Sequence, residues 1–191
     1  MIRNRNMVFS TAGDSSDNAD KFIQLPKISA ASLPTAGSSN EGGVVYDKTN
    51  DEVRFSDASN WHILPKYIEV SFHAQAASDM VDQTFFIAND SYQVVAVRFV
   101  HATAESTAAS LYVQVTKDTS TNAPGAGTDL LTNNSNSGFD AKATANTVQT
   151  GTLTSTTASL QLSAGDRLSV DFSAAATELA GVTITVTLKR I

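Results

Sequence analysis

The chain has 191 residues, enough for one full domain or for one domain and an arm. Its net charge of −6 excludes a general nucleic-acid binder, because neutralising phosphates requires a basic surface. The absence of cysteine excludes disulfides, thiolate metal sites and thiol nucleophiles.

Charged residues make up only 17% of the chain, and Ala, Ser, Thr and Asn take their place. Such an uncharged polar composition is common in extracellular and particle-bound β proteins. The first residues lack the apolar run of a signal peptide, and no segment reaches the roughly 18 apolar residues that span a bilayer. We therefore expect no membrane contact, synthesis in the cytoplasm, and departure from it only as part of a particle.

Residues 1–41 are expected to form an extended N-terminal arm. Residues 14–20 and 36–43 are polar and rich in turn formers. Between them lies a short apolar stretch, 22–28, which Pro26 prevents from forming a regular central strand. This stretch either packs along its own domain or lies extended on a neighbouring subunit or partner.

The tip of the arm is basic although the chain is acidic. It could dock into an acidic groove of a partner and become ordered on binding, or it could simply fray. The candidate docking residues are Arg3, Arg5, Met7, Phe9, Phe22, Ile23 and Leu25.

Residues 42–66 predict a small β-hairpin. Two strand-like runs, 44–46 and 52–55, flank a turn at 47–51. An isolated hairpin is marginal in water, so it needs a surface to lie on. The aromatic anchors are Tyr46, Phe55 and Trp61. Because the chain has no disulfides and its hairpin needs support, we predict that it forms a homotrimer.

Residues 67–191 predict an all-β domain, an antiparallel sandwich of jelly-roll type with about eight strands. Leu168, Val170 and Phe172 alternate with polar residues, which indicates one buried and one wet face. The expected strands lie within 67–74, 85–87, 93–101, 111–115, 147–153, 158–162, 167–172 and 182–188. A long loop, 117–142, is either functional or mobile.

No catalytic residue, cofactor or metal ligand is expected. The three histidines, His62, His73 and His101, show no metal-ligand spacing, and no Gly-x-Ser-x-Gly elbow is present. The acidic residues expected on wet faces or in loops are Glu69, Glu105, Asp166, Asp171 and Glu178. A calcium site in the long loop is a weaker alternative, with Asp118, Asn122, Asp129 and Asp140 as its oxygen donors.

Three motifs follow one another near the N-terminus: LPKISAASLPTAG at 25–37, GVVYD at 43–47 and FSDASNWH at 55–62. Their order resembles a module found near the N-termini of tailed-bacteriophage virion proteins, although Ala58 stands where that module commonly has Gly. The C-terminal half, from VRFVHA at 97–102 to Ile191, is similar to the β-sandwich of phage capsid-associated and fibre proteins. The two similarities together span residues 22–191.

This resemblance implies a non-enzymatic structural protein of the virion. It would be made in the bacterial host cytoplasm and then sit on the capsid surface as a decoration or head-fibre-like protein. Its partner would be the major capsid protein. The alternative is a tail-fibre protein that recognises host-surface glycans through the long loop, with Tyr92, Tyr112 and Phe139 as aromatic platforms. A depolymerase fits less well, because the sequence shows no carboxylate pair for it.

Overall fold

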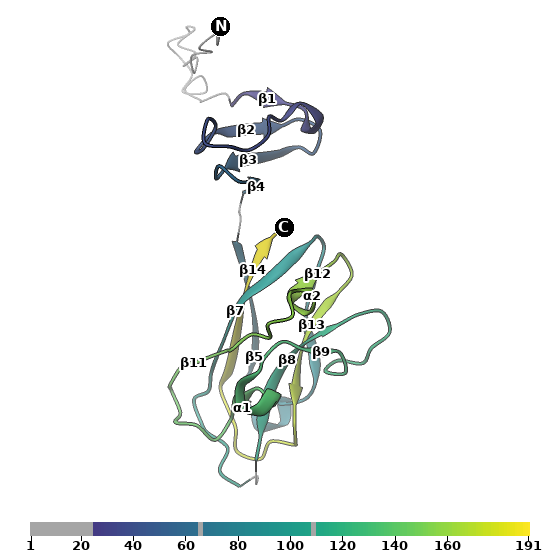
Figure 1. Ribbon diagram of the computed structural model, residues 1–191. Helices are drawn as coiled ribbons and strands as arrows, with labels where there is room; N and C mark the ends of the chain where they lie inside the picture. Colours follow the sequence, from purple (N-terminus) through teal and green to yellow (C-terminus); the bar gives the residue numbers. More distant parts are fainter. Residues whose placement is uncertain (1–24, 65–66, 108–109) are drawn as a thin grey trace, which may run out of the picture. The chain divides into compact units, whose positions relative to one another are not determined.

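The computed structural model describes residues 25–64, 67–107 and 110–191. They fall into two compact units, one ending at Leu64 and one beginning at Pro65 (Figure 1). The described residues are almost entirely strand, turn and loop, which confirms the predicted all-β class. No described helix is long and apolar enough to cross a membrane.

The first unit is a four-stranded sheet with the order β1-β2-β3-β4. Its elements are β1 (Lys27–Ile28), η2 (Ala30–Ser32), β2 (Val44–Asp47), β3 (Glu52–Ser56) and β4 (Trp61–Ile63). β1 is parallel to β2, and the other pairs are antiparallel. The predicted hairpin is therefore the centre of a larger sheet.

Residues 25–41, which were expected to belong to the extended arm, contribute the edge strand of this sheet. The backbone N–H of Tyr46 donates to the carbonyl of Pro26 at 2.9 Å, and Lys48 donates to Ile28 at 2.9 Å. Pro26 precedes the strand at a sheet edge, where its missing N–H leaves no ladder bond unmade. The small unit therefore includes these residues as well as the hairpin.

The second unit is an antiparallel β-sandwich. One sheet has the order β11-β7-β14-β5 with β12 beside β7, and the other has β10-β8-β13-β6 with β9 beside β8 (Figure 1). The strands of the first sheet are β5 (Tyr67–Ala74), β7 (Tyr92–Val100), β11 (Gln149–Thr150), β12 (Gln161–Leu162) and β14 (Val182–Arg190). The strands of the second sheet are β6 (Gln83–Ile87), β8 (Tyr112–Asp118), β9 (Thr128–Asp129), β10 (Phe139–Asp140) and β13 (Arg167–Phe172). Three short helical turns connect them: η3 (Ala77–Asp79), α1 (Asn133–Asn136) and α2 (Thr157–Leu160).

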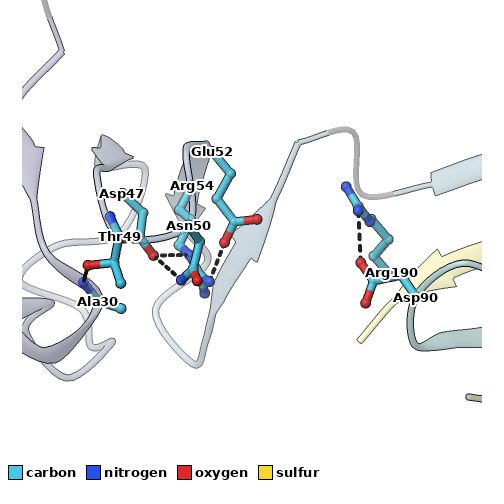
Figure 2. Close-up of polar contacts among 8 residues, drawn as sticks. All are labelled: Ala30, Asp47, Thr49, Asn50, Glu52, Arg54, Asp90 and Arg190. Carbon is cyan, nitrogen blue, oxygen red and sulfur yellow. Dashed lines mark hydrogen bonds and ion pairs between the residues drawn. The ribbon is translucent and has the colours of Figure 1, made fainter. Parts of the chain in front are cut away.

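The last strand, β14, lies between β5 and β7 and pairs with both. Its apolar residues, from Val182 to Leu188 in alternation, point into the core, as their period of two predicts. An ion pair of 2.8 Å between Arg190 and Asp90 joins the end of β14 to the turn before β7 (Figure 2).

Two predicted strands differ from the structure. Within 147–153 only Gln149–Thr150 pairs as a strand, followed by a bridge between Leu131 and Leu153. The predicted strand 158–162 is mostly the helical turn α2, and only its last two residues form β12. The Lys117 ammonium donates to the carbonyls of Ala158 and Gln161, and these bonds help to hold the turn.

The outward face of β8 and β13 is not wet, contrary to the expected alternation. Ser169 is fully buried, and so are Thr116 and Asp118 on the neighbouring strand. The long loop lies over them: the Arg167 guanidinium donates to the carbonyls of Ser120 and Asn122. The loop therefore covers part of the outward face of this sheet, whereas Ile87 at the edge of the same face stays 64% exposed.

Candidate functional site

The small sheet has two unequal faces, because directly paired residues on neighbouring strands share a side. The apolar face carries Val44, Tyr46, Val53, Phe55 and His62. The packed face carries Val45, Asp47, Arg54, Ser56 and Trp61. On the packed face Val45 is 6% exposed and Asp47 is fully buried, whereas Val44 on the apolar face is 39% exposed.

Asp47 organises the packed face (Figure 2). Its carboxylate accepts hydrogen bonds from the Thr49 N–H at 3.0 Å and the Asn50 amide at 2.9 Å, and it pairs with Arg54 at 3.1 Å. Arg54 also binds Glu52. Burial alone would raise the pKa of Asp47, but these hydrogen bonds and the nearby guanidinium outweigh it and lower the pKa below its usual value. The folded sheet therefore stabilises the ionised form of Asp47.

The loop before β2 packs on the same face through two polar side chains. Asn40 Oδ1 accepts hydrogen bonds from Ser56 Oγ at 3.0 Å and from the Gly37 N–H at 2.9 Å. The Trp61 indole N–H donates to the carbonyl of Pro34 at 2.8 Å. These contacts hold the loop against the sheet, and the residues that make them belong to the N-terminal motifs: Pro34, Gly37, Ser56 and Trp61.

A tight turn joins β3 to β4. Asp57 accepts hydrogen bonds from the N–H groups of Ser59 and Asn60 at 3.0 and 2.9 Å, and its other oxygen lies 2.5 Å from His62 Nε2. The Asn60 backbone bond, then the bonds from His62 and Ser59, lower the pKa of Asp57 well below its usual range. Ala58 has a φ of 72°, so it adopts the conformation that the common Gly of the motif would adopt without strain.

The three predicted anchors do not share one side. Tyr46 and Phe55 lie on the apolar face, and each is partly buried. Trp61 lies on the packed face beneath the loop. Sequence reasoning missed this division because the strand pairing, and with it the register of Trp61, was not known.

Most of the predicted docking residues lie outside the described part of the chain: Arg3, Arg5, Met7, Phe9, Phe22 and Ile23. Leu25 is described, and it is partly buried just before β1.

In the sandwich, the expectation that Glu105 lies on a wet face or in an exposed loop is wrong, because this residue is only 2% exposed. Its carboxylate accepts hydrogen bonds from the hydroxyls and backbone N–H groups of Thr107 and Thr177 at 2.6–3.1 Å, and also from the N–H of Glu178. The bonds from Thr177, against the effect of burial, hold the pKa of Glu105 far below its usual range. Glu105 therefore fastens two loops together as a buried anion.

His101 is also fully buried. Its Nε2 contacts the carbonyl of Ala143 at 3.0 Å, and its ring lies 5.3 Å from that of Phe99. His73, in contrast, is exposed and contacts Thr183 Oγ1 at 3.1 Å. Among residues 25–64, 67–107 and 110–191, no group of three His, Asp or Glu side chains could hold a metal ion.

Two of the oxygen donors considered for calcium already accept hydrogen bonds from the protein. Asp118 is buried, and its two oxygens accept hydrogen bonds from Thr116 and Gly125. Asp140 accepts one from the Lys142 N–H. Two of the three aromatic residues proposed as glycan platforms are not available at the surface, because Tyr92 is 4% exposed and Phe139 is fully buried.

Comparison with known proteins identifies no relative: no family model matches the chain, and neither a curated protein nor a solved structure is similar to it.

Proposed function

We propose that this chain is a non-enzymatic structural protein of a tailed-phage particle, attached to the capsid surface as a decoration or head-fibre-like protein. The small sheet would join copies into a trimer, and the N-terminal segment would bind the major capsid protein. The observation that carries the proposal is the apolar face, where Val44, Tyr46 and Val53 stay partly exposed, whereas Val45, Asp47 and Ser56 on the packed face are buried.

An apolar sheet face is stabilised when another layer covers it. A second copy of the same chain is a suitable layer, because closed symmetry lets each copy both cover and be covered. The motifs that resemble a virion module support the same role. Most of the polar and glycine residues of these motifs hold the loop against the packed face. The apolar face is therefore left for association.

The first test is the mass of the purified chain in solution at micromolar concentration. We expect light scattering to give three times the 20.1 kDa chain mass. Val44→Lys should shift the protein toward monomer, since a charge placed in an apolar interface is costly. Val148→Lys is the matched control: Val148 is 59% exposed in the sandwich, and this change should leave the trimer intact. A monomeric wild-type chain would contradict the trimer.

The second test concerns attachment. Deleting residues 1–24 leaves β1 and Asn40 in place, so the small sheet keeps its contacts. This variant should remain trimeric but fail to sediment with capsids that lack the protein, whereas the full chain should co-sediment. Immunogold electron microscopy with antibody to residues 67–191 should label particle heads. Label confined to tails would favour the receptor-binding alternative, and no label on any particle would contradict the virion role.

A further inference from the structure

One sheet of the sandwich ends in a long strand that has a neighbour on one side only. β5 pairs with β14 along eight consecutive residues without a register shift, and the described chain places no strand on its other side. Among the described residues, no backbone hydrogen bond joins residues 68–74 to any strand or loop other than β14. The outer row of backbone groups on β5 is therefore open to a further strand.

The ends of the other sheets in the described chain discourage such pairing. β1, β10 and β11 have two residues each, and β4 has three. β6 has five residues, and a register shift interrupts its pairing with β13. Short or bulged edge strands, Pro and Lys protect natural sheets against pairing with another chain. β5 is eight residues long and regular, and it contains neither Pro nor Lys.

The core is also incompletely covered along this edge. Phe72 and Ala74 of β5 are buried, whereas Ile68 and Val70, which point to the same side of the sheet, are only partly buried. A strand added beside β5 would cover these two side chains, because directly opposite residues on one face lie about 4.5–5.5 Å apart. The edge therefore offers backbone groups and apolar side chains to the same partner.

The outer face of β5 carries a symmetric polar pattern. Glu69 and His73 lie two residues before and two residues after Ser71, and all three side chains are exposed. Glu69 Oε1 accepts a hydrogen bond from the Thr187 hydroxyl at 3.3 Å, and His73 Nδ1 lies 3.1 Å from the Thr183 hydroxyl. These contacts with β14 leave the second carboxylate oxygen of Glu69 and Nε2 of His73 for another partner.

From this arrangement we infer that β5 pairs antiparallel with β5 of a second copy of the chain, about a twofold axis through Ser71. Two sandwiches then share one continuous sheet. In a twofold contact each residue faces its counterpart in the other copy, so each Glu69 lies directly opposite the His73 of the other copy. An acid and an imidazole therefore meet twice across the axis.

The side chains of β5 select this register over its neighbours. An axis through Glu69 would place two carboxylates opposite each other, which is destabilising. An axis through Val70 would place Glu69 opposite Ser71, so that its charge would lack a partner. With the axis at Ser71, the inner face also brings apolar residues together, because Val70 then lies opposite the Phe72 of the other copy.

The contact is small, since one strand from each copy buries less than the roughly 1,200 Å² of a stable interface. In dilute solution it is therefore transient, and it does not change the mass expected for the trimer. Where copies are held close together, the high local concentration favours it. The inference rests on the sandwich alone and does not require the trimer or capsid attachment.

The test uses the absence of cysteine from the chain. Ser71→Cys places two thiols opposite each other at the axis, where the Cα atoms of paired strands lie about 4.5–5.5 Å apart and a disulfide can form. Thr144→Cys, at an exposed position in a loop of the sandwich, is the matched control. Under mild oxidation of the full chain, Ser71→Cys should form linked dimers at least about tenfold faster than Thr144→Cys, because pairing raises the effective concentration of its thiols. Equal rates would overturn the inference.

Two further variants test the register. Glu69→Cys and His73→Cys should each link slowly alone, because each cysteine then faces a residue that is not cysteine. A mixture of the two variants should link one to the other rapidly, since the facing pair becomes two cysteines and the second Glu69–His73 pair is kept. Rapid linking of Glu69→Cys with itself would contradict the axis at Ser71.

Val44→Lys separates this pairing from the proposed trimer. In that background the rates of Ser71→Cys and Thr144→Cys should still differ at least about tenfold, because the thiols meet through β5 and not through the small sheet. If Val44→Lys abolishes the difference, the thiols meet through the trimer and the inference is wrong. If the wild-type chain is monomeric by light scattering but Ser71→Cys still links rapidly, the trimer fails and the pairing of β5 stands.

Discussion

In the sandwich, a continuous apolar cluster that includes Val97, Leu168 and Ile184 is excluded from water. In the described part of the small sheet, Val45 is the one apolar side chain in the buried class, and its buried neighbours are Asp47 and Ser56. The larger unit is thus held by hydrophobic burial, and the smaller one by hydrogen bonds and an ion pair. A sheet held in the second way buries little apolar surface of its own, so the proposed association through its apolar face would add to its stability.

The chain offers separate probes for the two units. Its one tryptophan, Trp61, lies in the small sheet. Its emission therefore reports on that sheet, whereas far-UV circular dichroism mainly follows the larger sandwich. Together the two probes separate an effect on one unit from an effect on the other.

The largest effect is expected from Phe99→Ala. Phe99 is 1% exposed and stacks on Phe139 with ring centroids 5.2 Å apart. Removing a buried ring costs about 3–5 kcal/mol, which lowers the melting temperature of the sandwich by on the order of 10–20 °C. Trp61 emission should keep its own transition. If that transition moves by the same amount, the two units unfold together and their separation is wrong.

Glu105→Gln should come next, at about 2 kcal/mol, because hydrogen bonds to a charged group are replaced by poorer ones. The substitution should lower the denaturant midpoint of the sandwich and leave Trp61 emission unchanged. An effect on Trp61 emission alone would contradict the placement of this network in the larger unit.

Glu105 also predicts how stability depends on pH. Its pKa is lowered in the folded state, so the ionised side chain contributes fully above its unfolded value of about 4.3, and the contribution is lost as the pH falls. Burial raises the pKa values of Asp129 and Asp171, which act in the opposite direction. The informative quantity is therefore the difference between wild type and Glu105→Gln, which should shrink from pH 6 to pH 3. A constant difference would mean that the carboxylate charge is not what stabilises the loops.

The sequence predicted the sandwich better than it predicted the buried polar groups. The period of two in β14 is strong because one face packs on the core and the other does not. Glu105 and Ser169 gave no such signal, since their burial depends on loops distant in sequence that fold over them. A polar residue in a loop is usually exposed, and only three-dimensional packing identifies the exceptions.

The same limit applies to the candidate sites. Tyr46, Phe55 and Trp61 could be selected as anchors by residue type, but their division between two faces required the pairing of β3 with β4. The burial of Gln114 could not be predicted either, because an amide at this position of a strand suggests exposure, whereas its Nε2 donates to the carbonyls of Leu131 and Asn136. The Asn-rich segment at 133–136 indicated a loop, but it did not indicate that Asn134, Ser135 and Asn136 all adopt positive φ values.

A smaller effect is expected from Ser56→Ala in the small sheet. Ser56 is 1% exposed, and its hydroxyl donates to Asn40 at 3.0 Å. Losing this hydrogen bond should cost about 1 kcal/mol, and only the Trp61 transition should shift. Ser71→Ala is a control: Ser71 is exposed in the sandwich, and this substitution should move neither probe. No shift for Ser56→Ala would show that polar contacts are not what holds the loop on this sheet.

The smallest effect is a gain in stability from Ala58→Gly. Ala58 holds a φ of 72°, which costs an L-residue about 1–2 kcal/mol and costs Gly almost nothing. Gly also gives the unfolded chain more freedom, which offsets about 0.5–1 kcal/mol of that gain. The net stabilisation should be below about 1 kcal/mol and should raise the denaturant midpoint followed by Trp61 emission. Ala36→Gly, in the same unit but without a positive φ, should lower it instead. If Ala58→Gly also lowers the midpoint, Ala58 does not adopt the left-handed turn in solution, and the match between this turn and the glycine of the virion motif fails.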